Sequence, residues 1–80
     1  MPSTQDFENE LDNIFAEAKK LGVCAVWIKS SDLHDKLNGN NELPKCCNAM
    51  DNKKEKGDII IQSPPKGQGR NLIIQYKIPR

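Results

Sequence analysis

The C-terminal part of the chain constrains the fold most, because two apolar segments there flank a loop rich in proline and glycine. The segments are "DIIIQS" (58–63) and "NLIIQYKI" (71–78), and the loop between them contains "PPKGQG" (64–69). In the second segment every other residue is apolar, the period of a strand with one buried face: Leu72, Ile74, Tyr76 and Ile78. Proline cannot donate to a strand ladder, and glycine tolerates the positive φ values of a tight turn. We therefore predict an antiparallel hairpin with its tip in the loop.

An amphipathic helix is predicted for the N-terminal segment. Ser3 is a suitable N-cap, Asp6 can accept from the first-turn backbone donors, and Gly22 marks the end. Apolar residues recur at the spacing of one helical stripe: Phe7, Leu11, Ile14, Phe15 and Ala18. We expect this stripe to pack on another helix and on the sheet.

The middle of the chain indicates one strand and two helices. The segment "VCAVWIK" (23–29) is short and β-branched, typical of a buried strand that includes Cys24 and has Trp27 in the core or as a partly exposed anchor. A short helix over 30–38 follows, capped by Ser30 or Ser31 and ended by "NGNN".

A third helix over 43–55 begins with Pro44 in its first turn and is closed by Gly57. Its predicted inner side consists of Leu43, Cys47 and Met50, with Cys46 near the edge and partly exposed. Its predicted outer side consists of Lys45, Asn48, Ala49 and Asn52, with Lys53 beside them.

Length and composition indicate a single small domain over residues 1–80. No apolar segment approaches the roughly 20 residues that span a bilayer, and the polar N-terminus is unlike a signal peptide. We therefore expect a cytoplasmic protein without membrane contact. Three cysteines, two of them adjacent, do not suit a disulfide framework, and with one histidine they do not form a zinc motif. We expect reduced thiols, no metal and no cofactor.

The order helix, strand, helix, helix, strand, strand resembles a winged helix–turn–helix domain, an α+β fold with three helices and a small antiparallel sheet. The short helix 30–38, the "NGNN" turn, the helix led by Pro44 and the hairpin carry the resemblance. More narrowly, "LPKCCNAM", "GDII" and "PPKGQGRNLIIQYKIPR" resemble a small uncharacterised prokaryotic winged-helix-like family. That family brings no known activity with it.

The winged-helix resemblance implies duplex DNA as the partner. In such domains the second helix of the pair enters the major groove and the wing contacts the backbone or the minor groove. Charge is divided along the chain: residues 1–40 carry four lysines against seven acids, and residues 41–80 carry eight basic residues against four acids. The expected DNA contacts are Lys45, Asn48, Asn52 and Lys53 on the third helix and Lys66 and Arg70 on the wing.

Other functions are weighed against this one. The glycines of "KGQGR" lie two apart and precede a strand, so they do not form a phosphate-binding loop. His34 has no nucleophile at a recognisable spacing, and we expect no enzyme. The first hypothesis is a DNA-binding protein, a small transcriptional regulator or an accessory nucleic-acid-binding subunit. The alternative is a winged-helix module that binds a protein partner or a second copy without DNA, favoured by the near-zero net charge and the acidic first helix.

Overall fold

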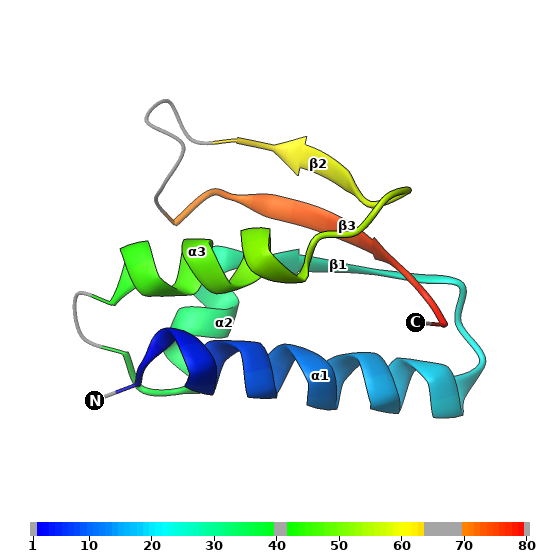
Figure 1. The fold of residues 1–80 in the computed structure, drawn as a ribbon, viewed down its shortest axis with the longest axis horizontal. Helices are drawn as coiled ribbons and strands as arrows, with labels where there is room; N and C mark the ends of the chain where they lie inside the picture. The colour runs from blue at the N-terminus through cyan, green and yellow to red at the C-terminus, as the bar shows by residue number, and fades with distance from the viewer. Residues whose placement is uncertain (1, 40–41, 64–69, 80) are drawn as a thin grey trace.

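The computed structural model describes residues 2–39, 42–63 and 70–79 and shows an α+β arrangement (Figure 1). The elements, in chain order, are α1 (Thr4–Leu21), β1 (Ala25–Lys29), α2 (Ser30–Lys36), α3 (Leu43–Lys53), β2 (Ile59–Gln62) and β3 (Ile73–Lys77). The strands form an antiparallel sheet in the order β1-β3-β2. The predicted sequence of elements is confirmed, as is the pairing of the last two strands with the first strand beside them.

Helix α1 is fixed at both ends by the residues that the sequence indicated. The Ser3 Oγ accepts from the Asp6 N–H at 3.2 Å, and the Asp6 carboxylate accepts from the Ser3 N–H at 2.8 Å, which completes a capping box. Gly22 ends the helix with φ of 75°, a left-handed conformation that costs glycine little. The predicted stripe is confirmed, with these residues buried: Phe7, Leu11, Phe15 and Ala18.

Helix α2 begins differently from the prediction. Lys29, the last residue of β1, occupies the N-cap without a side-chain hydrogen bond, so neither serine caps the helix. Ser30 and Ser31 are instead its first two residues, and both are buried. Their N–H groups donate to residues just before β3, Ser30 to the Leu72 carbonyl at 2.8 Å and Ser31 to the Arg70 carbonyl at 3.3 Å. Because these two carbonyls already satisfy the backbone N–H groups of Ser30 and Ser31, a capping side chain is unnecessary.

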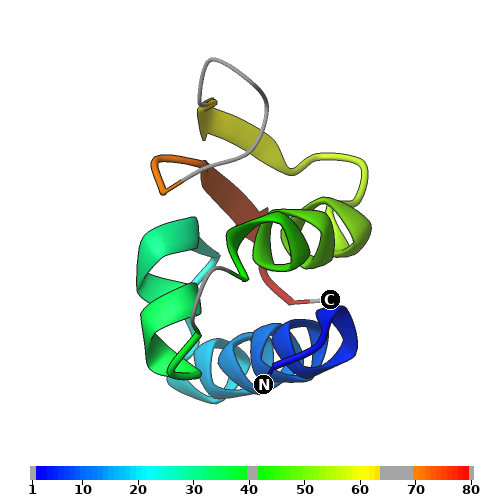
Figure 2. The same cartoon turned by 90° about the vertical axis from the view of Figure 1, so that its left-hand side faces the viewer.

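Strand β3 is the centre of the sheet, and the helices lie on one of its two sides (Figure 2). The alternating residues of the predicted strand are all buried toward the helices, as expected: Leu72, Ile74, Tyr76 and Ile78. The Tyr76 ring lies 4.9 Å from that of Phe15 on α1, and its hydroxyl donates to the Met50 carbonyl of α3 at 2.6 Å. The core therefore lies where α1, α3 and β3 meet.

The turn before β2 is organised by Asp58, which is 7% exposed. Its two carboxylate oxygens accept from the backbone N–H groups of Glu55 and Lys77, each at 2.7 Å. Gly57 beside it has φ of 99°, a conformation that favours glycine. This turn joins the end of α3 to the hairpin and fixes the start of β2 against β3.

Strand β1 is shorter than predicted and less buried. It begins at Ala25, and both Val23 and Cys24 are exposed in the segment that leads from α1 into it. Trp27 is 64% exposed, so it does not belong to the core. The difference follows from the position of β1 at an edge of the sheet, where only one face is covered by helices.

Replacing Phe15 by alanine should destabilise the protein strongly, because the side chain is 6% exposed and contacts Tyr76. We expect a loss of about 3–5 kcal/mol in the free energy of unfolding, measured by urea denaturation. Glu17→Ala, at an exposed position on the same helix, is the control and should change stability by less than about 0.5 kcal/mol. Similar losses for the two variants would show that the stripe is not core.

Candidate functional site

The two sides of α3 differ from the prediction at two positions. Ala49, expected on the outer side, is fully buried, and Cys46, expected to be partly exposed, is fully buried as well. Both differences arise because α3 lies against α1, α2 and the sheet, which together cover a wider arc than one apolar stripe (Figure 2). The exposed positions of the helix are Pro44, Lys45, Asn48, Asp51 and Asn52.

Lys45 and Asn48 lie one turn apart on the exposed side of α3, as predicted. The Lys45 Nζ is 3.1 Å from a carboxylate oxygen of Glu42, the residue just before the helix. The Lys45 side chain is 51% exposed, whereas that of Glu42 is 6% exposed. Lys45 therefore presents its ammonium to solvent while it compensates a largely buried carboxylate.

Asn52 and Lys53 are directed toward α1 rather than toward the other predicted contacts. The Asn52 Nδ2 donates to a carboxylate oxygen of Glu8 at 3.2 Å. The Lys53 Nζ lies 3.0 and 3.1 Å from the two carboxylate oxygens of Asp12. These contacts join α3 to the acidic face of α1. Asn52 remains exposed one turn from Asn48, but Asn52 and Lys53 both have partners on α1.

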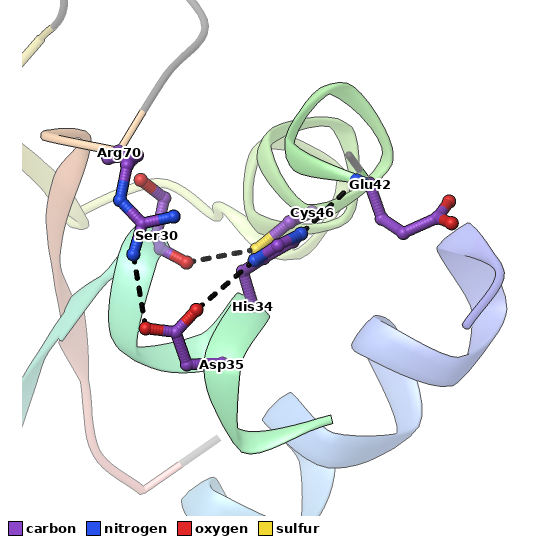
Figure 3. Close-up of polar contacts among 6 residues, drawn as sticks. All are labelled: Ser30, His34, Asp35, Glu42, Cys46 and Arg70. Carbon is purple, nitrogen blue, oxygen red and sulfur yellow. Dashed lines mark hydrogen bonds and ion pairs between the residues drawn. The ribbon is translucent and has the colours of Figure 1, made fainter. Parts of the chain in front are cut away.

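Arg70 lies beside α2, before β3 begins. Its Nη2 contacts a carboxylate oxygen of Asp35 at 3.1 Å (Figure 3). Both side chains are more than half exposed, so this ion pair contributes little stability and is screened by salt. The other predicted wing residue, Lys66, lies outside the described residues, as do the two loop glycines.

The polar cluster between α2 and α3 is centred on His34, which is 4% exposed (Figure 3). The His34 Nε2 accepts from the Glu42 N–H at 3.1 Å, and its Nδ1 lies 3.3 Å from an Asp35 carboxylate oxygen. An accepting Nε2 places the proton of the neutral ring on Nδ1, where it is directed to Asp35. A Cβ on Gly39 would lie 2.5 Å from the His34 Nε2, so the close approach of the chain requires glycine there.

Cys46 forms the second link in this cluster. Its Sγ donates to the Ser30 carbonyl at 3.4 Å, which joins α3 to the first residue of α2. Burial and, to a smaller extent, the neighbouring Cys47 together raise the pKa of the Cys46 thiol from 9.0 to about 12. A thiol with so high a pKa is protonated at neutral pH and is not a nucleophile.

These hydrogen bonds position α2 and α3 relative to each other. His34, Cys46 and Ser30 use their polar atoms in contacts between α2 and the beginning of α3, and these contacts fix the angle of the pair. Within residues 2–39, 42–63 and 70–79, no three histidine, cysteine or acidic side chains are placed to hold a metal ion. A search of the same residues finds no helix that is long and apolar enough to cross a membrane.

Comparison of the chain with known protein families, curated proteins and solved structures gives no match. Inferences about function therefore depend on the exposed surfaces and on their chemistry. Sequence reasoning identified the exposed side of α3 but missed Trp27 and the outward residues of the sheet. Residues 25–28 are all apolar, so no alternation in the sequence marked Trp27 as outward. A usable signal was present only in the last strand, where Gln75 and Lys77 alternate with buried residues.

The three thiols should differ in reactivity. The order is the reverse of that expected from the sequence, which placed Cys24 in a buried strand and Cys46 at a partly exposed position. Cys24 is exposed, whereas Cys46 and Cys47 are buried. With a thiol reagent near pH 8 we expect Cys24 to react at close to its rate in denaturant, and the other two at least about tenfold more slowly. Mass mapping of the labelled peptides measures this.

The variant Cys24→Ser is the control and should remove the fast phase alone. Because the pKa of Cys46 is raised in the folded state, the stability contributed by its neutral thiol is fully present below pH 9.0. It is lost as the pH rises toward about 12. Equal labelling rates for Cys24 and Cys46 would contradict the burial of α3 against α2.

Proposed function

We propose that the chain is a winged-helix domain that binds duplex DNA, with α3 as the recognition helix and the β2–β3 hairpin as the wing. The observation that carries the proposal is the arrangement of the elements. The helices α2 and α3 precede an antiparallel hairpin, and β1 pairs with the second strand of that hairpin in the order β1-β3-β2. This is the order expected of a winged helix, in which the second helix of the pair meets the major groove.

The exposed side of α3 supplies suitable chemistry for base contacts. Recognition helices contact base edges mainly through their N-terminal residues, and Lys45 and Asn48 lie in the first half of α3. The amide of asparagine can pair with adenine through two hydrogen bonds, and lysine can donate to guanine or to a phosphate. Both side chains are exposed, so duplex DNA can reach them without repacking of the core.

The intramolecular ion pairs set the electrostatic character of this surface. Lys45, Lys53 and Arg70 already lie against Glu42, Asp12 and Asp35, respectively. Each of these cations would therefore contact a phosphate by exchanging a carboxylate for it. Such an exchange gains less than a contact by an uncompensated cation, and it gives a shallow dependence of the binding constant on salt. We therefore propose modest nonspecific affinity. Lys45 and Asn48 are the principal contacts of the helix because they lie on its exposed side, not because their charge is uncompensated.

A second candidate function is binding of a protein partner. It is favoured by β2, an edge strand on which three consecutive isoleucines are exposed, Ile59 to 52%, Ile60 to 45% and Ile61 to 40%. Exposed apolar edge strands are suited to pairing with another chain. Salt-dependent binding to duplex DNA distinguishes the two candidate functions. A module that binds a protein through apolar side chains of β2 is not expected to bind duplex DNA.

Alanine variants of Lys45 and Asn48 should affect duplex binding in different ways. If Lys45 contacts phosphate, Lys45→Ala should weaken binding similarly for different sequences and reduce the salt slope by about 1. Asn48→Ala should leave the slope nearly unchanged and lower discrimination at one base pair by about 1–3 kcal/mol. Fluorescence titrations against several duplexes at two salt concentrations measure both effects.

A control variant and a variant with the opposite expected effect complete the test. Lys20→Ala removes an exposed lysine at the far end of α1 and should change duplex binding little. Asp12→Asn removes the carboxylate that holds Lys53 and should strengthen binding, because Lys53 then contacts phosphate without an exchange. If the unmodified protein shows no salt-dependent duplex binding at low ionic strength, the DNA-binding proposal fails and the partner-binding function becomes the better one.

A further inference from the structure

The side of the sheet that faces away from the helices carries a distinct set of side chains. On the side that faces the helices, Ile28, Ile74 and Tyr76 are buried and Val26 is half-buried. Ile60 of the edge strand β2, the partner of Ile74, is 45% exposed. The alternate residues point outward, and six of them define what is here termed the outer sheet face: Trp27, Lys29, Ile59, Ile73, Gln75 and Lys77. The register places Trp27 and Ile59 on either side of Gln75, with Lys29 beside Ile73.

Trp27 is a strongly exposed aromatic residue of this face, with 64% of the residue exposed. Its indole Nε1 donates to the Gln75 Oε1 at 2.8 Å, across the two paired strands. The hydrogen bond satisfies the one polar group of the ring within the chain and directs the indole toward β3. What Trp27 offers to a ligand is therefore an apolar aromatic surface held in place, rather than a hydrogen-bond donor.

The charge of the outer sheet face is of one sign. Two of its six residues are lysines and none is acidic, and the remaining outward strand positions, Ala25 and Gln62, are uncharged. Beyond the edge of β1, a hollow of about 270 Å³ continues from Trp27 and Lys29 toward α2, where Asp32 lines it. The six residues of the face thus contribute two cations, an aromatic ring and no acid. The carboxylates beside it are those of Asp32 in the hollow and of Asp58, which accepts from the Lys77 N–H.

We infer that the outer sheet face binds single-stranded nucleic acid, with one base stacked on Trp27 and the phosphates near Lys29 and Lys77. An aromatic side chain on a positively charged, open surface is the arrangement by which proteins hold unpaired bases with little sequence preference. In a duplex the bases are already stacked on one another, and their faces are closed to a side chain. The absence of acids from these six residues favours a polyanion over a second copy of the chain, whose contact would bring like charges together.

The binding surface is separate from the exposed side of α3, and the inference does not depend on duplex binding there. The helices cover one side of the sheet, and the outer sheet face is its other side (Figure 2). Variants of Lys45 or Asn48 should therefore leave binding of a single strand unchanged. Loss of single-strand binding and loss of duplex binding can thus be told apart.

The fluorescence of Trp27 tests the inference directly, because the chain has one tryptophan. Titration with a 12-nucleotide oligothymidylate at low ionic strength should quench the emission of Trp27, and the effect should weaken as salt is added. Trp27→Leu should weaken binding of the fluorescently labelled oligonucleotide, followed by anisotropy, by about 5- to 150-fold, as expected for the loss of one stacked base. Trp27→Phe should lose less, because a smaller ring still stacks.

Matched variants separate the face from general effects of charge and apolar surface. Lys29→Ala should weaken binding several-fold and lower the salt slope, whereas Lys20→Ala, at the end of α1, should not. Leu21→Ala removes a side chain that is 72% exposed away from the face and should also have no effect. Thermal unfolding of each variant confirms that the fold is retained, as expected for exposed positions.

Three results would overturn the inference. The first is unchanged affinity of Trp27→Leu for the oligonucleotide. The second is equal quenching by a hairpin duplex without any preference for the single strand. The third is a change of Trp27 emission with protein concentration in the absence of nucleic acid, which would show that a second copy covers the face.

Discussion

The hydrogen bond from the Tyr76 hydroxyl to the Met50 carbonyl, at 2.6 Å, is the interaction on which the rest of the structure depends. Met50 belongs to the last turn of α3, where backbone carbonyls have no donor within the helix. Tyr76 satisfies one of these carbonyls from the middle of the sheet and also packs its ring on Phe15 of α1. One fully buried side chain therefore joins β3, α1 and α3, and its burial excludes water from both contacts.

The other end of α3 is held by polar contacts with α2. His34 accepts from the Glu42 N–H, and Cys46 donates to the Ser30 carbonyl. Because α3 is fixed at both ends, one of its sides stays exposed with Lys45 and Asn48. The helices lie together on one side of β3, so the opposite side of the sheet also stays open. Two surfaces of different chemistry result, a helix with amide and ammonium groups and a sheet with an indole and two lysines.

Local periodicity was sufficient to predict most of the architecture. The stripe of α1, its capping box and the alternating residues of β3 depend on spacings of a few residues, which the sequence shows directly. The burial of Cys46 and Ala49 was not predictable in this way, because it depends on how many elements surround α3. The absence of a serine cap on α2 has a similar cause, since the donors are satisfied by carbonyls that lie about 40 residues away along the chain.

The candidate site was predictable only in part, for a related reason. Lys45 and Asn48 lie on the exposed side of α3 that the helical period indicated. Asn52 and Lys53 meet Glu8 and Asp12, more than 40 positions away in the sequence, and no spacing rule connects such residues. The outer sheet face could not be predicted from the sequence, because its members come from three separate strands. Only the register of β1 and β2 against β3 brings Trp27, Gln75 and Ile59 into one row.

The central claim is that two separate surfaces serve two forms of nucleic acid. It is tested most directly by nuclear magnetic resonance of the ¹⁵N-labelled protein, with duplex and single-stranded oligonucleotides added in separate titrations. We predict that duplex DNA shifts the amide signals of α3, and that the single strand shifts those of 25–29 and 73–77. The same set of shifts for both ligands, or none for either, would contradict the claim.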